Sequence, residues 1–225
     1  MKIKALVPMK DLSERVSKKN YRPFGNHKPL FTHIVSTLLK CGKIQEIIIN
    51  TDSEKIKNYC KCNFPSIQII DRPENLTDGS IPMNEIIKHD LSLVDGEIFL
   101  QTHSTNPLVK SETFDKAINV FLNNFPKKDS LFSVNKYQTR LWDKNGKTIN
   151  HNKNILLKTQ DLEPLYEENS CIYIFERKSF LENNNRIGHK PIIFEMDKFE
   201  SIDIDEEIDF YIAEKMYHFN LKNKR

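Results

Sequence analysis

The chain has 225 residues, 38% of them hydrophobic and 29% charged, which is typical of one globular domain over residues 1–225. Its formal net charge of +3 is too small to indicate the concentrated basic face of a nucleic-acid-binding protein. No apolar run approaches the roughly 20 residues of a membrane span and no signal peptide is recognisable, so we expect a cytoplasmic protein without a membrane partner.

The first part of the chain alternates between strand and helix patterns. Strands are predicted at 3–7, 46–50, 67–70, 97–101 and 130–134. Amphipathic helices are predicted between them at 29–39, 53–59, 83–93 and 111–123. The strand at 46–50 is a continuous apolar run, as expected for a parallel strand that is covered on both faces. This order predicts an α/β fold with three layers and a mostly parallel sheet.

The pattern changes in the last third of the chain. Residues 136–165 are polar and show no sustained period, so we expect an insertion or arm outside the main sheet. Strands are predicted again at 171–175 and 192–196, and a final helix at 205–219.

The loop after the first strand is basic and rich in hydrogen-bonding groups. It contains Lys10, Ser13, Arg15, Lys19 and Asn20. Ligands of open α/β sheets bind at the carboxyl ends of strands, and such donors suit phosphate oxygens. The loop has neither the GxxxxGK[ST] nor the GxGxxG pattern of common phosphate-binding loops. It therefore predicts either a site for a polyanion such as a nucleoside triphosphate or a solvated charged loop.

A second candidate site lies near the other end of the chain, in the sequence Ser-Ile-Asp-Ile-Asp at 201–205. In an extended segment Asp203 and Asp205 point to one side, while Ile202 and Ile204 point to the core. Paired carboxylates favour a bound cation, and Mg²⁺ is often held by one or two carboxylates together with substrate phosphates. Alternatively, Asp205 caps the last helix and Asp203 faces solvent. Both roles are compatible.

Other polar groups follow the central strands. Asp52 is predicted to cap the helix at 53–59, and Arg72 follows the third strand. The segment 101–107, which begins with Gln101 and includes His103, suits a hydroxyl-rich ligand such as a sugar, or is simply a polar turn. His103 is a candidate base.

A series of different short motifs is spread along almost the whole chain. The opening loop reads PMKDLSERVSKKN and matches P-A-R-x-x-S-K-x-x-x-x-K-N, with Lys10 in place of Arg and Glu14 in place of Lys. The other motifs are KPLFTHIV, INTDSEKI, RPENLTDGS, FLQTHSTNPL, DSLFSV, ENSCIYIF and SIDIDEEIDF. Together they resemble the acylneuraminate cytidylyltransferase family, the CMP-sialic acid and CMP-Kdo synthetases.

The resemblance implies a Rossmann-like nucleotidyltransferase that activates a 2-keto sugar acid with CTP for bacterial surface polysaccharide synthesis. It implies nucleotide contacts from Lys10, Ser13, Arg15, Lys19, Asn20 and Arg72. Lys10, Arg15, Lys19 and Asp205 would be catalytic, with Mg²⁺ held by Asp203 and Asp205. Gln101 and Asn169 would bind the sugar. A protruding dimerisation arm within 136–190 would make the protein a homodimer.

Other functions also fit parts of the pattern. The acceptor could be Kdo or another surface sugar acid. Asp203-Ile204-Asp205 is also a DxD sequence, which metal-dependent glycosyltransferases use. A third possibility is a non-catalytic nucleotide-binding protein, since Glu14 departs from the family motif.

Overall fold

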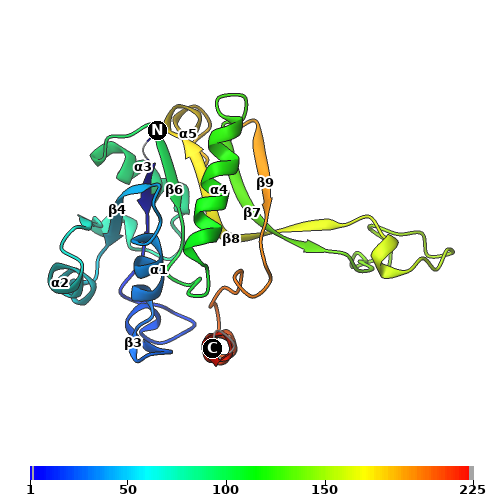
Figure 1. Cartoon of the computed structure of the whole chain (residues 1–225), viewed down its shortest axis with the longest axis horizontal. Coiled ribbons are helices and arrows are strands. Elements are labelled where there is room, and N and C mark those ends of the chain that lie inside the picture. The colour runs from blue at the N-terminus through cyan, green and yellow to red at the C-terminus, as the bar shows by residue number, and fades with distance from the viewer. Residues whose placement is uncertain (2, 223–225) are drawn as a thin grey trace.

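A computed structural model describes residues 1 and 3–222 and shows a seven-stranded sheet with helices on both faces (Figure 1). The strands, in the spatial order β5-β4-β1-β6-β8-β7-β9, are β5 (Gln68–Asp71), β4 (Ile44–Thr51), β1 (Ile3–Leu6), β6 (Ile98–Gln101), β8 (Leu165–Glu176), β7 (Ser130–Tyr137) and β9 (Pro191–Glu195). The first four are mutually parallel, whereas β8 runs antiparallel to both of its neighbours. β9 is parallel to β7. The predicted mostly parallel, three-layer α/β fold is confirmed.

The helices form two outer layers with separate apolar cores. On one face lie α1 (Phe31–Leu38), α2 (Glu54–Asn63) and α4 (Ser111–Asn124). On the other lie α3 (Met83–Leu93) and α5 (Arg177–Asn183). In β4, Ile47 and Ile49 join the first core and Ile48 the second, because successive side chains of a strand point to opposite faces. This explains the unbroken apolar run of the strand.

A third, smaller core fixes the last helix beside the basic loop. The hairpin of β2 (Pro23–Phe24) and β3 (Lys28–Pro29) packs against α6 (Glu207–Lys222). Phe24, Phe210 and Ile204 are buried together in this core. Burial of Ile204 anchors the segment that carries Asp203 and Asp205.

The predicted elements differ from the structure mainly at their ends. α2 continues to Asn63 rather than ending at residue 59, and α6 begins at Glu207 rather than at residue 205. α5 was not predicted, because it follows β8 directly and its N-cap residue makes no side-chain hydrogen bond. Short 3₁₀ turns at Lys19–Tyr21, Glu74–Leu76 and Thr159–Asp161 were not predicted either.

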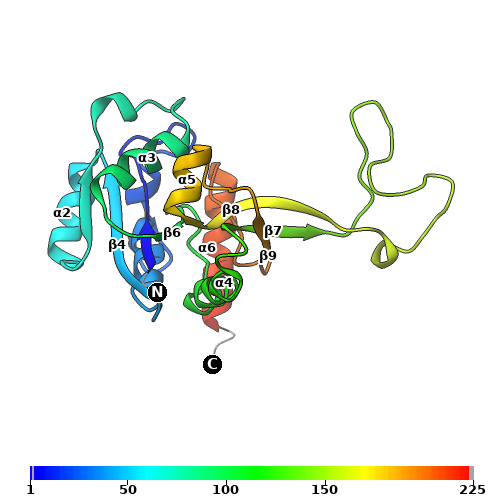
Figure 2. The same ribbon diagram turned by 90° about the horizontal axis from the view of Figure 1, so that it is seen from above.

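The outer parts of β7 and β8 form an arm that projects from the body of the molecule (Figures 1 and 2). Their pairing ends at Tyr137 and Leu165, and residues 138–164 form the tip. Within the predicted 136–190 region, the inner half of β8 and all of α5 belong to the body instead. The tip exposes the apolar side chains of Ile155, Leu156 and Leu157. Within the described residues, no helix is long and apolar enough to cross a membrane.

Candidate nucleotide site

A cleft of about 300 Å³ lies where β1 ends. Its walls come from the basic loop after β1, the loop after β5 and the loop after β6. Every residue predicted to contact the nucleotide lines this cleft, namely Lys10, Ser13, Arg15, Lys19, Asn20 and Arg72. The structure therefore brings these side chains together at the carboxyl end of the sheet, where α/β folds bind ligands.

Buried Asn20 fixes the shape of the basic loop. Its Nδ2 donates to the backbone oxygen of Lys10 at 2.8 Å, and its Oδ1 accepts from the hydroxyl of Ser104 at 2.6 Å. The first bond curls the loop upon itself, and the second ties it to the loop after β6. The two bonds thus fix the basic loop next to the loop after β6, which forms another wall of the cleft.

Asp205 joins the two ends of the chain at this site. Its Oδ1 lies 2.6 Å from Nη2 of Arg15 and 3.8 Å from Nζ of Lys19. Lys19 also donates to the backbone oxygen of Ile204 at 2.6 Å. Burial lowers the pKa of Lys19, while the carboxylates of Asp205 and Asp203 raise it. Two of the predicted phosphate-binding cations, Arg15 and Lys19, are therefore paired with the predicted metal ligand Asp205.

Asp203 is more deeply placed than its partner. Its Oδ1 is buried and, within the described residues, has no hydrogen-bond partner. Burial raises the pKa of Asp203, while a hydrogen bond from Thr105 lowers it. The alternative that Asp203 faces solvent does not hold, because the residue is only partly exposed and its Oδ1 is buried.

The two helix caps predicted for aspartates are also wrong. At the start of α6 the carboxylate of Asp209, rather than that of Asp205, accepts the backbone N–H groups of Asp205 and Glu206. At the start of α2 the cap is Ser53, whose hydroxyl accepts from the backbone of Ile56. Asp52 instead accepts the backbone N–H of Asp11 at 2.8 Å. Asp52 thereby braces the basic loop.

The residues predicted for the sugar lie beside the cleft and do not line it. Gln101 ends β6, is fully buried and pairs in register with Tyr173 of β8. Asn169 lies further along β8, where its Oδ1 accepts from the hydroxyl of Ser133 at 2.6 Å. His103 connects the two regions, because it lines the cleft and its Nε2 lies 3.1 Å from Nε2 of Gln101.

His103 does not resemble a strong base. Burial, together with the nearby charges of Arg186 and Lys19, lowers its pKa to about 3. The imidazole is neutral at ordinary pH, but a ring with so low a pKa accepts a proton poorly. Its contacts are those of a group that positions neighbouring side chains.

Arg186 belongs to the same region and was not predicted. Its guanidinium lies 3.5 Å from the ring centre of Tyr173 and donates to Oε1 of Gln101 at 2.5 Å. It comes from the asparagine-rich segment after α5. No spacing or motif distinguishes this arginine in the sequence, and only the fold brings it to Gln101.

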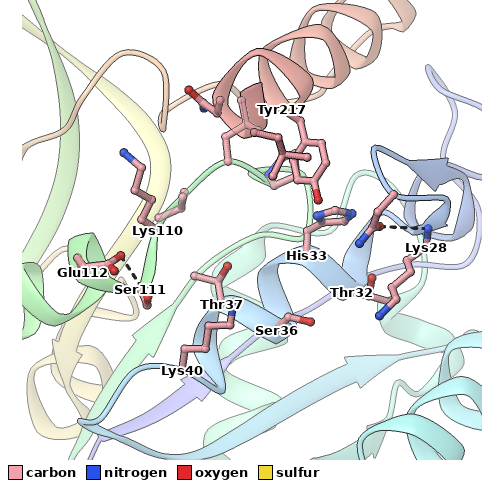
Figure 3. Close-up of a pocket in the computed structure, with 16 residues that line it drawn as sticks. Lys28, Thr32, His33, Ser36, Thr37, Lys40, Lys110, Ser111, Glu112 and Tyr217 are labelled. Atoms are coloured by element: carbon pink, nitrogen blue, oxygen red, sulfur yellow. Dashed lines mark hydrogen bonds between the residues drawn. The ribbon is translucent and has the colours of Figure 1, made fainter. Parts of the chain in front are cut away.

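A second cavity, of about 560 Å³, lies between α1, the start of α4 and α6 (Figure 3). The labelled Lys28 comes from the hairpin, His33 from α1, Lys40 from the turn after α1, and Tyr217 from α6 (Figure 3). Lys110, which also lines it, is already paired with Glu200 at 2.8 Å. None of the predicted nucleotide, sugar or metal residues is on its wall. The smaller cleft is therefore the better candidate for the reaction.

Two solved structures share the fold of this chain. A CMP-2-keto-3-deoxy-manno-octonic acid synthetase, solved in complex with CTP, superposes with a TM-score of 0.70 at 11% identity, over 99% of this chain and 100% of that one. A 4-diphosphocytidyl-2C-methyl-D-erythritol synthase from Anaerococcus prevotii gives 0.67 at 16% identity, over 96% and 98%. At such identities the likeness establishes the shared fold.

Proteins of similar sequence are named as cytidylyltransferases or as a CMP-sugar acid synthase. The CMP-N,N'-diacetyllegionaminic acid synthase of Legionella pneumophila is 27% identical over 98% of each chain. The N-acylneuraminate cytidylyltransferase of Escherichia coli is 26% identical over 94% of this chain, which spans only 51% of that longer protein. The pseudaminic acid cytidylyltransferase of Campylobacter jejuni is 21% identical over 98% of each chain. The cytidylyltransferase family model matches residues 4–223, so this chain belongs to the cytidylyltransferase family and is a nucleotidyltransferase.

Proposed function

We propose that this cytidylyltransferase transfers CMP from CTP to the anomeric hydroxyl of a 2-keto sugar acid and releases pyrophosphate. The observation that carries this proposal is the cleft lined by Lys10, Arg15 and Lys19, two of which, Arg15 and Lys19, also pair with Asp205. The printed names of the Legionella, Escherichia and Campylobacter relatives support an acceptor of the sialic acid type.

The reaction requires fixed positive charge around the phosphates. The acceptor hydroxyl oxygen forms a bond to the α-phosphorus, and the bond from that phosphorus to the pyrophosphate oxygen breaks. Lys10, Arg15 and Lys19 hold the triphosphate and offset the charge that accumulates during the transfer. Ser13 and Asn20 contact the nucleotide from the same loop, and Arg72 contacts it from the wall after β5.

The carboxylates of Asp203 and Asp205 fit a divalent metal. The orphaned, buried Oδ1 of Asp203 is an oxygen donor without a protein partner among the described residues. The described part of the chain contains no group of three or more His, Cys, Asp or Glu side chains that could hold a metal ion without other ligands. A pair of carboxylates suits Mg²⁺, which commonly takes its remaining ligands from water and substrate phosphates. When bound, Mg²⁺ would supply Lewis-acid stabilisation of phosphoryl charge.

Ligand binding also requires an exchange of partners within the site. Arg15 and Lys19 both contact Asp205 in the structure. A triphosphate offers these cations new partners and frees the carboxylate for a metal. Asp205 is thus assigned a catalytic role together with Lys10, Arg15 and Lys19.

The acceptor would lie toward β8. Gln101 and Asn169 are placed on adjoining strands next to the cleft, and we assign them to the sugar. The loops at 72–84 and 101–107 would shape the choice among sugar acids. Kdo remains the alternative acceptor, supported by the fold of the CMP-Kdo synthetase.

We also propose that the enzyme is a homodimer assembled through the arm. The exposed apolar residues at the tip of a projecting hairpin support this assembly. The DxD sequence at 203–205 would also suit a glycosyltransferase. The match of nearly the whole chain to cytidylyltransferases supports nucleotidyl transfer instead.

Pyrophosphate release tests the proposed function. The purified enzyme is incubated with CTP or UTP, MgCl₂ and a panel containing neuraminic, legionaminic, pseudaminic and Kdo acids. We expect release with CTP and at least one of these acids, and loss of release in Asp205→Asn. Asp95→Asn, an exposed aspartate in the loop before β6, is the matched control and retains activity. Turnover by Asp205→Asn at the wild-type rate would contradict the metal assignment.

A further inference from the structure

A buried polar network lies beneath the wall of the cleft that Arg72 forms. It consists of Asn50 at the end of β4, Arg72 after β5, and Asp90 with its neighbour His89 in α3. Asn50, Arg72 and Asp90 are 0%, 6% and 1% exposed, respectively. Sequence motifs gave no reason to link α3 to the nucleotide, because its helical pattern is that of an ordinary core helix.

Asn50 accepts hydrogen bonds from two nitrogens of the Arg72 guanidinium. Nε of Arg72 donates to Oδ1 of Asn50 at 2.6 Å, and Nη2 donates to the backbone oxygen of Asn50 at 3.1 Å. These bonds fix the plane of the guanidinium. In the described part of the chain Nη1 donates to no protein atom, so it is left for a ligand in the cleft.

Two residues of α3, Asp90 and His89, set the orientation of the Asn50 amide. Its Nδ2 donates to Oδ1 of Asp90 at 2.5 Å and lies 3.4 Å from Nδ1 of His89. The amide N–H groups therefore face α3, and only the carbonyl oxygen faces Arg72. If the amide turned over, its N–H groups would meet the N–H groups of Arg72, and both sides would lose their acceptors.

Asp90 is an expensive residue for a helix to bury. Its Oδ2 has no partner among the described residues, and burial raises its pKa to about 7, against the lowering effect of Asn50 and Arg72. A leucine at this position would cost less, since an unpaired buried carboxyl oxygen is unfavourable. A costly polar group that contacts a binding-site residue through one intermediate indicates a role in that site.

We propose that Asp90 is a positioning residue for CTP, acting through Asn50 to fix Arg72. This inference rests on the proposed use of the cleft for CTP. The Asp90 side chain does not touch the ligand. By accepting from Nδ2 of Asn50, Asp90 turns the amide so that its oxygen, rather than its nitrogen, faces Arg72. The orientation of Arg72 Nη1 depends on this arrangement.

The test is a double-mutant cycle read by calorimetric CTP binding in the presence of MgCl₂. Asp90→Leu removes the acceptor, and we expect CTP affinity to fall about tenfold, the usual effect of losing a hydrogen bond that supports a charged group. Asp90→Asn keeps an oxygen for Nδ2 of Asn50 and should restore most of the affinity. In an Arg72→Lys background, which retains charge but not the planar fork, Asp90→Leu should have almost no further effect.

A control separates positioning from loss of stability. Ile87→Ala truncates a fully buried residue of the same helix that belongs to the apolar core and does not line the cleft. It should lower the melting temperature at least as much as Asp90→Leu and leave CTP affinity unchanged. Kinetics should agree, with Asp90→Leu raising KM for CTP and leaving KM for the sugar acid unchanged.

The outcomes distinguish this inference from the proposed function. Wild-type CTP affinity in Asp90→Leu, an undiminished effect of that change in the Arg72→Lys background, or an equal loss in Ile87→Ala would overturn it. If the wild type binds CTP but releases no pyrophosphate with any acid, the proposed reaction fails and the binding cycle still decides the role of Asp90. Failure of the wild type to bind CTP would overturn both.

Discussion

Lys19 and Arg15 both pair with the carboxylate of Asp205, but they differ in how far their side chains are exposed to solvent. The side chain of Lys19 is 13% exposed, whereas those of Arg15 and Asp205 are 60% and 48% exposed. A solvated pair such as Arg15 with Asp205 contributes little to stability, because water and salt screen it. The buried lysine acts through a medium of lower dielectric constant, where its charge has more effect on a bound phosphate.

Lys19→Gln should therefore reduce activity strongly, whereas its neighbour Lys18 offers a matched control. Lys18 lies outside the cleft and is exposed. We expect Lys19→Gln to lower kcat/KM for CTP roughly 10²-fold, as for the loss of one preorganised charge-stabilising group. Lys18→Gln should leave it nearly unchanged. Similar losses of kcat/KM in both variants, measured by pyrophosphate release, would show that activity depends on the total charge of the loop and not on the position of Lys19.

His103 makes stability depend on pH in a defined direction. Burial lowers its folded-state pKa to about 3 from an ordinary value of 6.5. Between these values the unfolded chain binds a proton at this residue and the folded chain does not. Stability from this source is present above pH 6.5 and is lost as the pH falls toward 3.

Replacement of His103 by Gln should flatten this acid-dependent loss. Urea unfolding is measured for both proteins from pH 7 down to pH 4. The free-energy difference between wild type and His103→Gln should change in favour of the variant as the pH falls. Parallel profiles across the range would contradict the buried, neutral state of the imidazole.

The hairpin of β2 and β3 positions α6 and, with it, the acidic segment at 203–205. Gly25 has a φ of +57°, and a Cβ placed on it would lie 2.5 Å from two ring atoms of Tyr217. Its backbone N–H donates to Glu214 at 3.1 Å. The close approach of hairpin and helix thus requires glycine for both conformation and space.

Gly25→Ala should destabilise the protein and reduce activity together. We expect an unfolding free energy lower by about 2–4 kcal/mol, from backbone strain and overpacking. Gly146, on the arm, has a φ of +76° with nothing within 4 Å of a Cβ. Gly146→Ala should show only the strain, about 1 kcal/mol, and normal turnover. Equal losses of stability and activity in the two variants, measured by urea unfolding and pyrophosphate release, would refute this role of the hairpin.

Much of the sheet and its helices could be predicted because their signals are local. The apolar run of β4 and the stripes of α1 and α4 reflect burial on two faces or on one. The meeting of the basic loop with Asp203 and Asp205 was also predictable from the family motifs. The Asp90 network, Arg186 and the Asp209 cap depend on side-chain contacts between distant segments, and no periodic pattern records them.

In the proposed homodimer the tip of the arm would form the interface. Leu156 at its tip is 89% exposed, and Leu181 on α5 is 56% exposed. Leu156→Glu should convert a dimer to monomers in sedimentation velocity, because a buried charge without a partner is unfavourable at an interface. Leu181→Glu, the same change on the body, should leave the dimer intact. A Leu156→Glu variant that stays dimeric would place the interface elsewhere.

The strands of the arm are continuous with those of the body, and their pairing is irregular at one place. The register shifts between Phe132 and Val134, and Ser170 opposite has a φ of 58°. Asn169 lies at this irregularity and is bonded to Ser133 and Asn135. Asn169 therefore lies where the arm joins the body, whereas Gln101 lies in the regular pairing of β6 with β8. Assembly through the arm and the shape of the proposed sugar subsite would thus depend on the same pair of strands.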